Sequence, residues 1–379
     1  MRIRTRLPWA VAGLLAAGFP APLAAQWLEV GEVKVAREET EAAGPRIALE
    51  YEIKEAGLSA AAPAWVFIRY TRDGGGTWHR LPSPQLRGNG HGLVDSPGKK
   101  RSVWWGVDQL GAGGLDAAAF RVHALPMVSV PGGKFTMKAV PGGGHDQTKA
   151  AVEAADLPAF CLAKYEVTVG MYADYLNEAC RKGGGWNPKM ANAERCGIER
   201  AEDGSFKVLP GRANYPVTYV SWYNAAAFLE WCGLRLPAEA EMIKATRGGH
   251  FLDGDGAKKV PNPMPERKYP WGDEAPDGGG VYRCNFDGEE DGFAGTAPAG
   301  SFSKFAGPYG ACDLAGNVAE WTIDSYATTF HTGLDGYRIV RGGSWMDPPE
   351  GCDAITAPTS LPIKETAIVG FRGVFEVGP

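Results

Sequence analysis

Apolar and polar residues alternate in short runs through the first third of the chain, beyond residue 25. Turn signals rich in Gly and Pro separate the runs, notably at residues 72–76 and 96–98. Short strands at this spacing are typical of an antiparallel β-sandwich. We therefore expect residues 26–125 to form a small all-β sandwich of immunoglobulin or fibronectin type, used for adhesion, spacing or carbohydrate contact or as a purely structural module. The expected strands lie at residues 29–35, 46–53, 65–70, 102–105 and 120–123.

After Leu125 the pattern changes to helices separated by irregular stretches with many turns. Each expected helix has a recognisable end signal, because Ser and Thr cap helix N-termini and Gly ends helices. We expect residues 127–379 to form one α+β unit with few regular elements. The signals are Thr168 as the cap of a helix over 169–179, a second helix that begins at Val220 or Ser221 and ends at Gly233, and a third with Pro237 in its first turn that ends at 248–249.

The first 25 residues have the pattern of a secretory signal peptide. Arg2, Arg4 and Arg6 precede an apolar run over residues 9–19, and small residues follow as far as Ala25. The apolar run is too short to span a bilayer as a helix, and no later segment is long or apolar enough. No cysteine follows it as an attachment point for lipid. We expect an exported protein, periplasmic or extracellular, without a membrane span.

Charge argues against nucleic-acid partners. The net charge of the full chain is −5, and removal of residues 1–25 takes away three arginines and no acid, which gives −8. An acidic protein without a clustered Lys/Arg stripe does not favour phosphate backbones or anionic lipids. Lys99-Lys100-Arg101 is the densest basic group, and we interpret it as a solvated hairpin edge.

The cysteine count is odd, which leaves at least one thiol unpaired within the chain. There are seven cysteines, and none of their spacings is C-x-x-C, which disfavours a structural zinc site or a thioredoxin-type motif. Export permits disulfides. The first expected pair is Cys180 with Cys196, which flank a Gly-rich polar loop, and the second is Cys284 with Cys312.

Six word-like segments follow one another in the second part of the chain. Together they resemble the formylglycine-generating enzyme (sulfatase-modifying factor) family, and the likeness runs from about Met127 to the C-terminus. The resemblance implies a C-type-lectin-like α+β fold, in which Trp345 is an aromatic core residue and Arg372 a buried, paired guanidinium. The segments are Pro216–Trp222, Arg235–Glu241, Tyr269–Gly272, Gly310–Trp321, Arg341–Trp345 and Gly370–Arg372.

Two oxygen-rich segments match the positions where this family places two calcium ions. Calcium accepts carboxylate, amide and backbone carbonyl oxygens in flexible geometry, so a turn that mixes Asp, Asn or Glu with Gly can wrap one ion. The alternative for each acid is a solvated loop charge or a turn cap. We expect both ions to be structural. The expected ligands are Asn285, Phe286, Asp291 and Phe293 in the first segment, and Asp313, Gly316, Val318 and Glu320 in the second.

The catalytic positions depart from the family. Its enzymes hold two cysteines, five residues apart, that bind copper and carry the oxidation, and the matching positions here are Asp347 and Cys352. Cu(I) prefers thiolate ligands, and a carboxylate is a poor substitute. Cys352 alone could be a reactive thiol, a disulfide partner or a small buried residue, and the buried role is the commoner.

Two function classes therefore remain. The first, which we favour, is a non-catalytic, calcium-stabilised scaffold that binds an unknown protein, peptide or glycan, with loops that present the ligand-binding face as in variable proteins on this fold. The second is an oxidoreductase that uses O2 to convert a cysteine of a protein, such as a sulfatase, to formylglycine. Copper is doubtful because of Asp347. Iron chemistry of the sulfoxide-synthase branch is improbable, because the six histidines show no ligand spacing.

Overall fold

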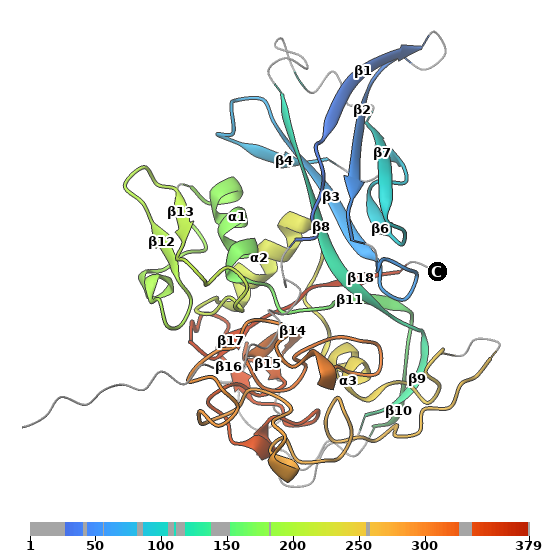
Figure 1. Ribbon diagram of the computed structural model, residues 1–379, viewed down its shortest axis with the longest axis vertical. Helices are drawn as coiled ribbons and strands as arrows, with labels where there is room; N and C mark the ends of the chain where they lie inside the picture. Colours follow the sequence, from blue (N-terminus) through green and yellow to red (C-terminus); the bar gives the residue numbers. More distant parts are fainter. Residues whose placement is uncertain are drawn as a thin grey trace, which may run out of the picture.

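The fold places a β-rich part at one end and, at the other, a mixed part whose described residues include three α-helices (Figure 1). The structure is a computed structural model. It describes residues 27–40, 44–55, 57–81, 86–104, 110, 118–137, 152–181, 183–254, 258–325 and 336–377. The expected signal peptide lies outside the described residues.

Two sheets form the first part. One has the order β1-β2-β7-β5, and the other places β3 between β8 and the short strands β4 and β6. Apolar side chains from both sheets pack together, with Ile47 and Trp104 of the first sheet against Ile68 and Tyr70 of the second. The strands are β1 (Lys34–Thr40), β2 (Gly44–Ile53), β3 (Ala64–Thr71), β4 (Trp78–Arg80), β5 (Leu86–Gly88), β6 (Gly92–Val94), β7 (Gly98–Trp104) and β8 (Ala119–Val130).

Strand β8 passes from the first part into the second without a break. Its first half pairs with β3 along eight residues, and its second half pairs with β11 (Phe160–Ala163), which in turn pairs with β18 (Val374–Glu376). The expected division near Leu125 falls in the middle of this strand, where Leu125 and Met127 are both buried. The two expected units therefore share one strand, and no loop separates them.

Helices α1 and α2 have the capping residues that the sequence predicts, whereas α3 has its predicted end at Gly248 but not its predicted start. Thr168 Oγ1 accepts from the Met171 N–H at the start of α1, and Ser221 caps α2, which ends at Gly233 with a positive φ. Helix α3 has Ala238 at its N-cap, which offers no side-chain acceptor. The Glu241 carboxylate accepts the Ala238 N–H at 2.7 Å, and the Asp324 carboxylate accepts the Glu239 N–H at 2.6 Å. Pro237 precedes that cap rather than lying in the first turn. The helices are α1 (Val169–Ala179), α2 (Trp222–Cys232) and α3 (Glu239–Arg247).

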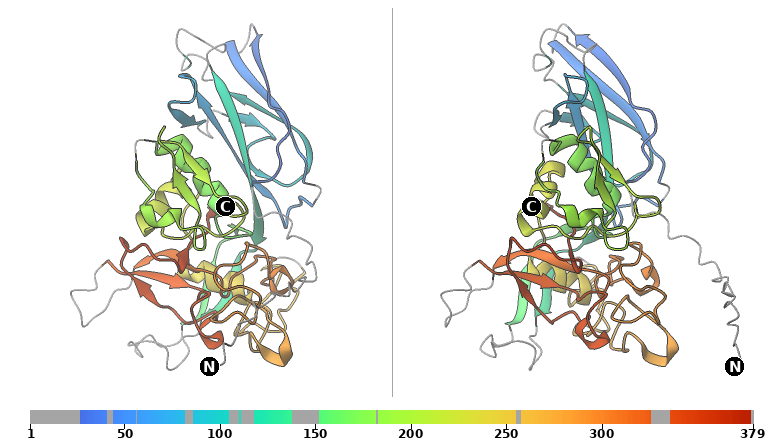
Figure 2. Two further views of the ribbon diagram at one scale, coloured as in Figure 1. Left: turned by 60° about the vertical axis from the view of Figure 1, so that its left-hand side comes forward. Right: turned by 90° about the vertical axis from the view of Figure 1, so that its left-hand side faces the viewer.

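Irregular loops and short strands make up the rest of the second part. Its largest sheet has the order β16-β15-β14-β17, with β14 and β17 parallel, and it lies beside α3 (Figure 2). The remaining elements are β9 (Gly133–Met137), β10 (Val152–Leu157), β12 (Ile198–Arg200), β13 (Phe206–Val208), β14 (Ala319–Ser325), β15 (Arg338–Arg341), β16 (Thr359–Ser360), β17 (Val369–Gly370) and the 3₁₀ turns η4 (Pro188–Ala191), η5 (Gly278–Gly280), η6 (Ser303–Phe305) and η7 (Pro349–Gly351).

The largest apolar cluster joins the two parts. Trp65 and Phe67 of β3 pack in it with Tyr175 of α1 and Trp231 of α2. The Phe67 and Trp231 rings meet edge to face with centroids 5.2 Å apart, and Trp65 Nε1 donates to the Cys232 carbonyl at 2.8 Å. Burial of each large aromatic side chain contributes about 1.5–3 kcal/mol to folding stability. Because these side chains belong to one buried cluster, the two parts share a continuous core.

A buried carboxylate adds an electrostatic link to that core. Glu178 of α1 has a fully buried side chain and faces Arg69 of β3 and both Arg121 and His123 of β8, at 3.4, 2.9 and 3.3 Å. Burial would raise the pKa of Glu178, but the contacts with His123 and Arg121 and the charge of Arg69 outweigh it and hold the pKa below its ordinary value. The Glu178 side chain is therefore ionised in the folded protein at neutral pH.

Replacement of Glu178 tests how much this link contributes. Glu178→Ala leaves Arg69 buried without its counter-charge, and we expect it to lower the free energy of unfolding by about 3 kcal/mol, measured by urea denaturation. Arg121→Ala removes a partner of the same carboxylate whose side chain is 53% exposed, so the expected loss is below about 1 kcal/mol. Equal losses in the two variants would contradict this account.

The same link predicts acid sensitivity. A carboxylate whose pKa is lower in the folded state contributes fully to folding stability above its unfolded-state pKa of about 4.3. That contribution is lost as the pH falls through the folded-state pKa. Glu178→Gln should therefore have a lower free energy of unfolding than the unmodified chain at neutral pH. The difference between the two free energies should shrink as the pH is lowered below about 4.3.

Candidate functional site

The two segments predicted to bind calcium contact each other directly. Asp313, Gly316 and Asn317 all have positive φ, which folds the second segment into a tight loop ahead of β14. A Cβ on Gly316 would lie 2.2 Å from the Asn285 carbonyl oxygen, and the Asn317 N–H donates to that same oxygen at 2.8 Å. Glycine is required at this close approach. The two loops therefore form one unit.

Glu320 of the second segment is engaged by a buried arginine. Arg372 is fully buried, and its Nε and Nη2 donate to the two carboxylate oxygens of Glu320 at 2.7 and 2.6 Å. Arg372 also donates to the carbonyls of Cys312 and Asp313. The Asp313 carboxylate accepts the Gly300 N–H at 2.5 Å. Both predicted carboxylate ligands thus already have protein partners.

A third buried acid, Glu166, lies beside this segment and was not predicted. Both of its carboxyl oxygens accept from the Asn317 side-chain amide, at 3.1 and 2.9 Å. Burial, together with the charges of Asp313 and Glu320, raises its pKa well above the ordinary value. Burial likewise raises the pKa of Asp313 to about 6. Three buried acids thus share one guanidinium, and either protonation or a bound cation would relieve the surplus negative charge.

The first segment has an acceptor without a partner. The Asn285 amide group donates to the Gly295 carbonyl at 2.8 Å and to Asn317 Oδ1 at 3.1 Å, while its own Oδ1 is buried and accepts no hydrogen bond. Asp291 closes the loop by accepting the N–H groups of Phe286 and Phe293, at 3.0 and 2.9 Å. A buried, unsatisfied oxygen is costly, so this segment suits a cation that binds through oxygen.

Carboxylates alone do not form a metal site in the described part of the chain. No group of three or more His, Cys, Asp or Glu side chains is arranged to hold an ion within those residues. A cation at either segment would therefore depend on amide and backbone carbonyl oxygens as well, which are ligands that calcium accepts. The residues of the first segment fit calcium better than those of the second, because the second has no comparable free acceptor.

Asp347, at the position of the missing cysteine, stabilises its own loop. Its Oδ2 accepts from the backbone N–H and the hydroxyl of Ser344, at 2.8 and 2.6 Å. Its carbonyl accepts the Asp287 N–H at 2.9 Å. These bonds are those of a side chain that fixes a turn, and they leave the carboxylate turned into the loop.

Cys352 is fully buried. Its sulfur lies 3.9 Å from the Ser344 carbonyl oxygen and 3.8 Å from that of Pro348. The chain packs so closely here that a Cβ on Gly343 would lie 2.7 Å from the Gly351 carbonyl oxygen. A substrate thiol could not reach this sulfur without movement of the loop.

The expected disulfide pairs are not formed in the structure, where all seven cysteines are free. The Cys180 thiol is hydrogen-bonded to Tyr175 rather than to Cys196. The Cys284 thiol contacts that of Cys352 rather than that of Cys312, and this contact, together with burial, raises the pKa of Cys284 well above its ordinary value. The prediction of a Cys284–Cys312 pair was wrong. It relied on the motifs beside the two cysteines in the sequence, whereas the loops that lie side by side in the fold determine which thiols meet.

An exposed apolar surface surrounds Trp222. The Trp222 N–H donates to the Pro362 carbonyl and its Nε1 to the Thr322 carbonyl, which places residues 361–363 and 323 beside it. Ile363 is 71% exposed and Tyr223 is 53% exposed. We call this surface the Trp222 face; it consists of Trp222, Tyr223, Ile323, Leu361 and Ile363.

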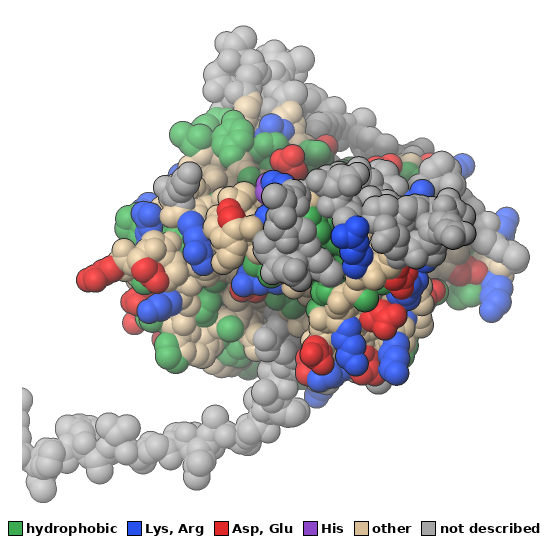
Figure 3. Space-filling view, turned by 90° about the horizontal axis from the view of Figure 1, so that it is seen from above, with side chains coloured by type: hydrophobic (Ala, Val, Ile, Leu, Met, Phe, Trp, Pro, Cys, Tyr) green, Lys and Arg blue, Asp and Glu red, His purple; other side chains and the backbone are tan. Residues whose placement is uncertain are grey.

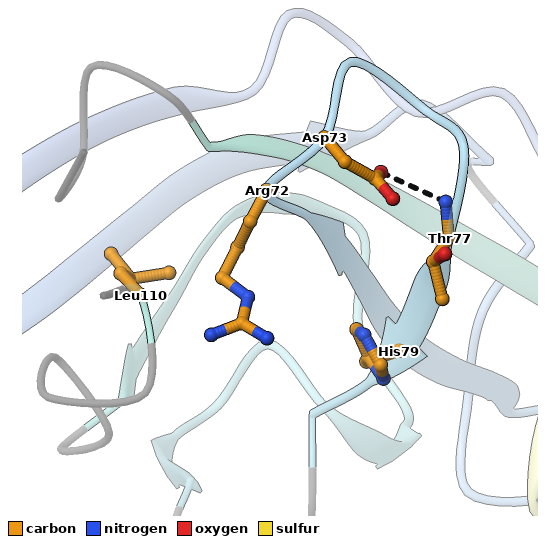
Figure 4. A pocket seen from close by; sticks show the side chains of 5 residues that line it. All are labelled: Arg72, Asp73, Thr77, His79 and Leu110. Carbon is orange, nitrogen blue, oxygen red and sulfur yellow. Dashed lines mark hydrogen bonds between the residues drawn. The ribbon is translucent and has the colours of Figure 1, made fainter. Parts of the chain in front are cut away.

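A pocket of about 470 Å³ lies in the first part, at the turn between β3 and β4 (Figure 4). Arg72, Asp73, Thr77, His79 and Leu110 line it. The Asp73 carboxylate accepts from the Thr71 hydroxyl and the Thr77 N–H. These bonds lower the pKa of Asp73 to about 2, and the bond from Thr71 has the larger effect. Asp73 is therefore a turn residue, and the pocket is separate from the predicted calcium segments.

Charged side chains are mixed on the surface. Figure 3 shows basic and acidic side chains of the described residues interspersed over the face seen from above, without a wide area of one sign. The described side chains seen there therefore form no wide positive surface for a phosphate backbone. Among the described residues, no helix has both the length and the apolar character needed to cross a bilayer.

Comparisons with known proteins place most of the chain in one group. Residues 116–377 match the family model "Sulfatase-modifying factor enzyme 1-like domain". A formylglycine-generating enzyme of Thermomonospora curvata is 30% identical over 305 residues, which cover 66% of this chain and 93% of that protein. The inactive Cα-formylglycine-generating enzyme 2 of Mus musculus is 29% identical over 285 residues, 66% of this chain and 86% of that protein. The structure of PvdO from Pseudomonas aeruginosa aligns with a TM-score of 0.46 at 21% identity, over 67% of this chain and 95% of that one.

Proposed function

The chain belongs to the family of sulfatase-modifying factor enzyme 1-like domains, and from that premise we propose that it is an exported, non-catalytic scaffold that calcium stabilises and that binds a protein segment. The matched region has the C-type-lectin-like α+β fold of the family, as expected from its motifs. Membership does not decide activity, because the relatives include both an enzyme and a protein named inactive. The alternative is an oxidoreductase of the formylglycine-generating type.

The observation that carries the proposal is the pair of positions 347 and 352. The Asp347 carboxylate is bound to Ser344 and is a hard oxygen ligand, whereas Cu(I) prefers thiolates. The thiol that does contact Cys352 is that of Cys284, and both sulfurs are buried. A metal between them would have no open face for a substrate thiol, so the residues present do not fit the copper site of the enzymes.

Calcium is the proposed structural ion. In the first segment it would be held by Asn285 Oδ1, the Asp291 carboxylate and the carbonyls of Phe286 and Phe293. In the second it would be held by Asp313, Glu320 and the carbonyls of Gly316 and Val318. The free acceptor on Asn285 and the surplus of buried acids around Arg372 support these two assignments.

The Trp222 face is the proposed ligand-binding surface. It exposes four aliphatic or aromatic side chains around a half-buried Trp, and Arg338 stacks on that Trp with its guanidinium carbon 4.0 Å from the ring centroid. Aromatic and Arg side chains are the residues most enriched in the energetic centres of protein interfaces. An extended peptide segment with apolar side chains fits this chemistry better than a glycan.

Oxidation of a sulfatase peptide separates the two functions. We expect no loss of the thiol of a Cys-x-Pro-x-Arg peptide when it is incubated with copper, O2 and the mature chain, whose N-terminal peptide should begin at Gln26. Asp347→Cys restores the family's pair, and Asp347→Ala controls for loss of the bonds to Ser344. If the unmodified chain instead consumes the peptide thiol in a copper-dependent way that is absent from Cys352→Ser, that result would contradict the scaffold proposal and support the enzymatic alternative.

Chelation tests the calcium assignment. A ligand that binds only the native state stabilises it by about 2.7 kcal/mol at a hundred times its Kd, so EDTA should lower the melting temperature by several degrees and added calcium should restore it. Asp291→Ala should remove much of this response, whereas Glu289→Ala, an exposed acid of the same loop, should keep it. Melting curves that are identical with EDTA and with calcium would rule out the ions.

Peptide selection tests the Trp222 face. A displayed library of random peptides, selected on the folded chain, should yield apolar sequences whose binding falls at least tenfold in Ile363→Asp. A tenfold loss corresponds to about 1.4 kcal/mol, within the range for one interface anchor. Val260→Asp changes another exposed apolar residue, 44% accessible, elsewhere on the chain and should bind as well as the unmodified protein. Equal losses in the two variants, or no enriched peptides, would contradict the proposed face.

A further inference from the structure

We propose that Cys284 and Cys352 form an intramolecular disulfide that ties the first predicted calcium segment to the loop of Asp347. The two cysteines pack in one small buried apolar cluster with Phe286 and Ala315, where their thiols interact with each other. The two residues are 1% and 0% exposed. Neither the family match nor the motifs assign this bond.

The backbone around the two cysteines is already held together. The Asp287 N–H, three residues after Cys284, donates to the Asp347 carbonyl at 2.9 Å. Cys352 follows the short turn η7 and packs on Gly343. The two segments are thus adjacent at more than one point, and a sulfur–sulfur bond would link chain segments that already touch rather than pull distant ones together.

The other five cysteines have different surroundings. The Cys161 thiol is hydrogen-bonded to Ser129, that of Cys180 to Tyr175, and that of Cys312 points to the Gly310 carbonyl at 3.7 Å. Cys196 lies against Thr218, and the Cys232 sulfur lies 3.2 Å from the Phe228 carbonyl oxygen. None of these five described contacts is with another thiol.

The bond forms by exchange with a low-molecular-weight or protein disulfide. One cysteine thiolate attacks the oxidant and releases its first thiol, and the second cysteine then attacks the mixed disulfide and releases the other. One sulfur–sulfur bond breaks and one forms. Two electrons pass from the cysteine sulfurs to the oxidant, and the two cysteine protons end on the released thiols.

Burial determines when this exchange can take place. Because neither sulfur is accessible in the folded chain, the bond forms before folding is complete and is afterwards shielded from reductants. It closes a loop that contains both predicted calcium segments and the whole of β14 and β15, and long closed loops restrict the unfolded chain most.

Thiol mapping after refolding tests the proposal. The full chain is refolded with oxidised glutathione, and free thiols are alkylated in denaturant before digestion. We expect five of the seven cysteines to be alkylated, a single linked peptide pair that contains Cys284 and Cys352, and alkylation of all seven after reduction. Alkylation of all seven without reduction, or a linked pair of other cysteines, would overturn the proposal whatever the variants below do.

Melting temperatures supply an independent readout. Cys284→Ser and Cys352→Ser should each lower the melting temperature of the oxidised chain by roughly 5–10 °C, to the value of the reduced unmodified chain, and the double variant should fall no further. Cys312→Ser, which alters an equally buried cysteine without a thiol contact, should keep the difference between oxidised and reduced protein. Loss of that difference in Cys312→Ser, or its persistence in Cys284→Ser, would overturn the assignment.

Discussion

The buried guanidinium of Arg372 holds the second part of the molecule together. It donates to both carboxylate oxygens of Glu320 at the start of β14, to the carbonyls of Cys312 and Asp313, and to those of Ala163 and Lys164 at the end of β11. One side chain thereby satisfies acceptors from three segments that are far apart in sequence. A guanidinium offers five donors in a fixed plane, which a lysine cannot match. Removal of this group would leave a buried carboxylate and several carbonyls without partners.

The surroundings of Arg372 also explain the position of the acids. Glu166, Asp313 and Glu320 are all buried near one positive charge, an arrangement that is stable only if protons or cations balance the excess. Loops that lack regular secondary structure satisfy their backbone groups in the same way, by side-chain contacts such as those of Asn285, Asn317 and Asp347. The predicted calcium segments, the loop of Asp347 and the buried thiols are consequently parts of one packed region.

Local signals predicted local structure well. The caps at Thr168, Ser221 and Gly233 each depend on one turn of chain, so the sequence located both ends of α1 and the end of α2, and it placed the start of α2 within two residues. Contacts between distant residues could not be found in this way. Glu166 reaches its partner Asn317 across 151 positions, and no pattern near Glu166 marks it. The Cys284–Cys352 contact and the role of Asp347 in fixing a turn likewise depend on how loops meet. The motif resemblance identified the family and its missing thiol, because those features are written in the residues themselves.

Strand β8 makes the registers of the two parts depend on each other. Side chains alternate faces along a strand, so a shift by one residue exchanges the buried and exposed sets. Since β8 pairs with β3 at one end and β11 at the other, a single inserted or deleted residue near its middle would misalign its pairing with either β3 or β11, whichever end stayed in place. If the first part was joined to the second by recombination, the joint had to preserve the alternation of side chains along β8 as well as the reading frame. Insertions and deletions within this strand should therefore be selected against.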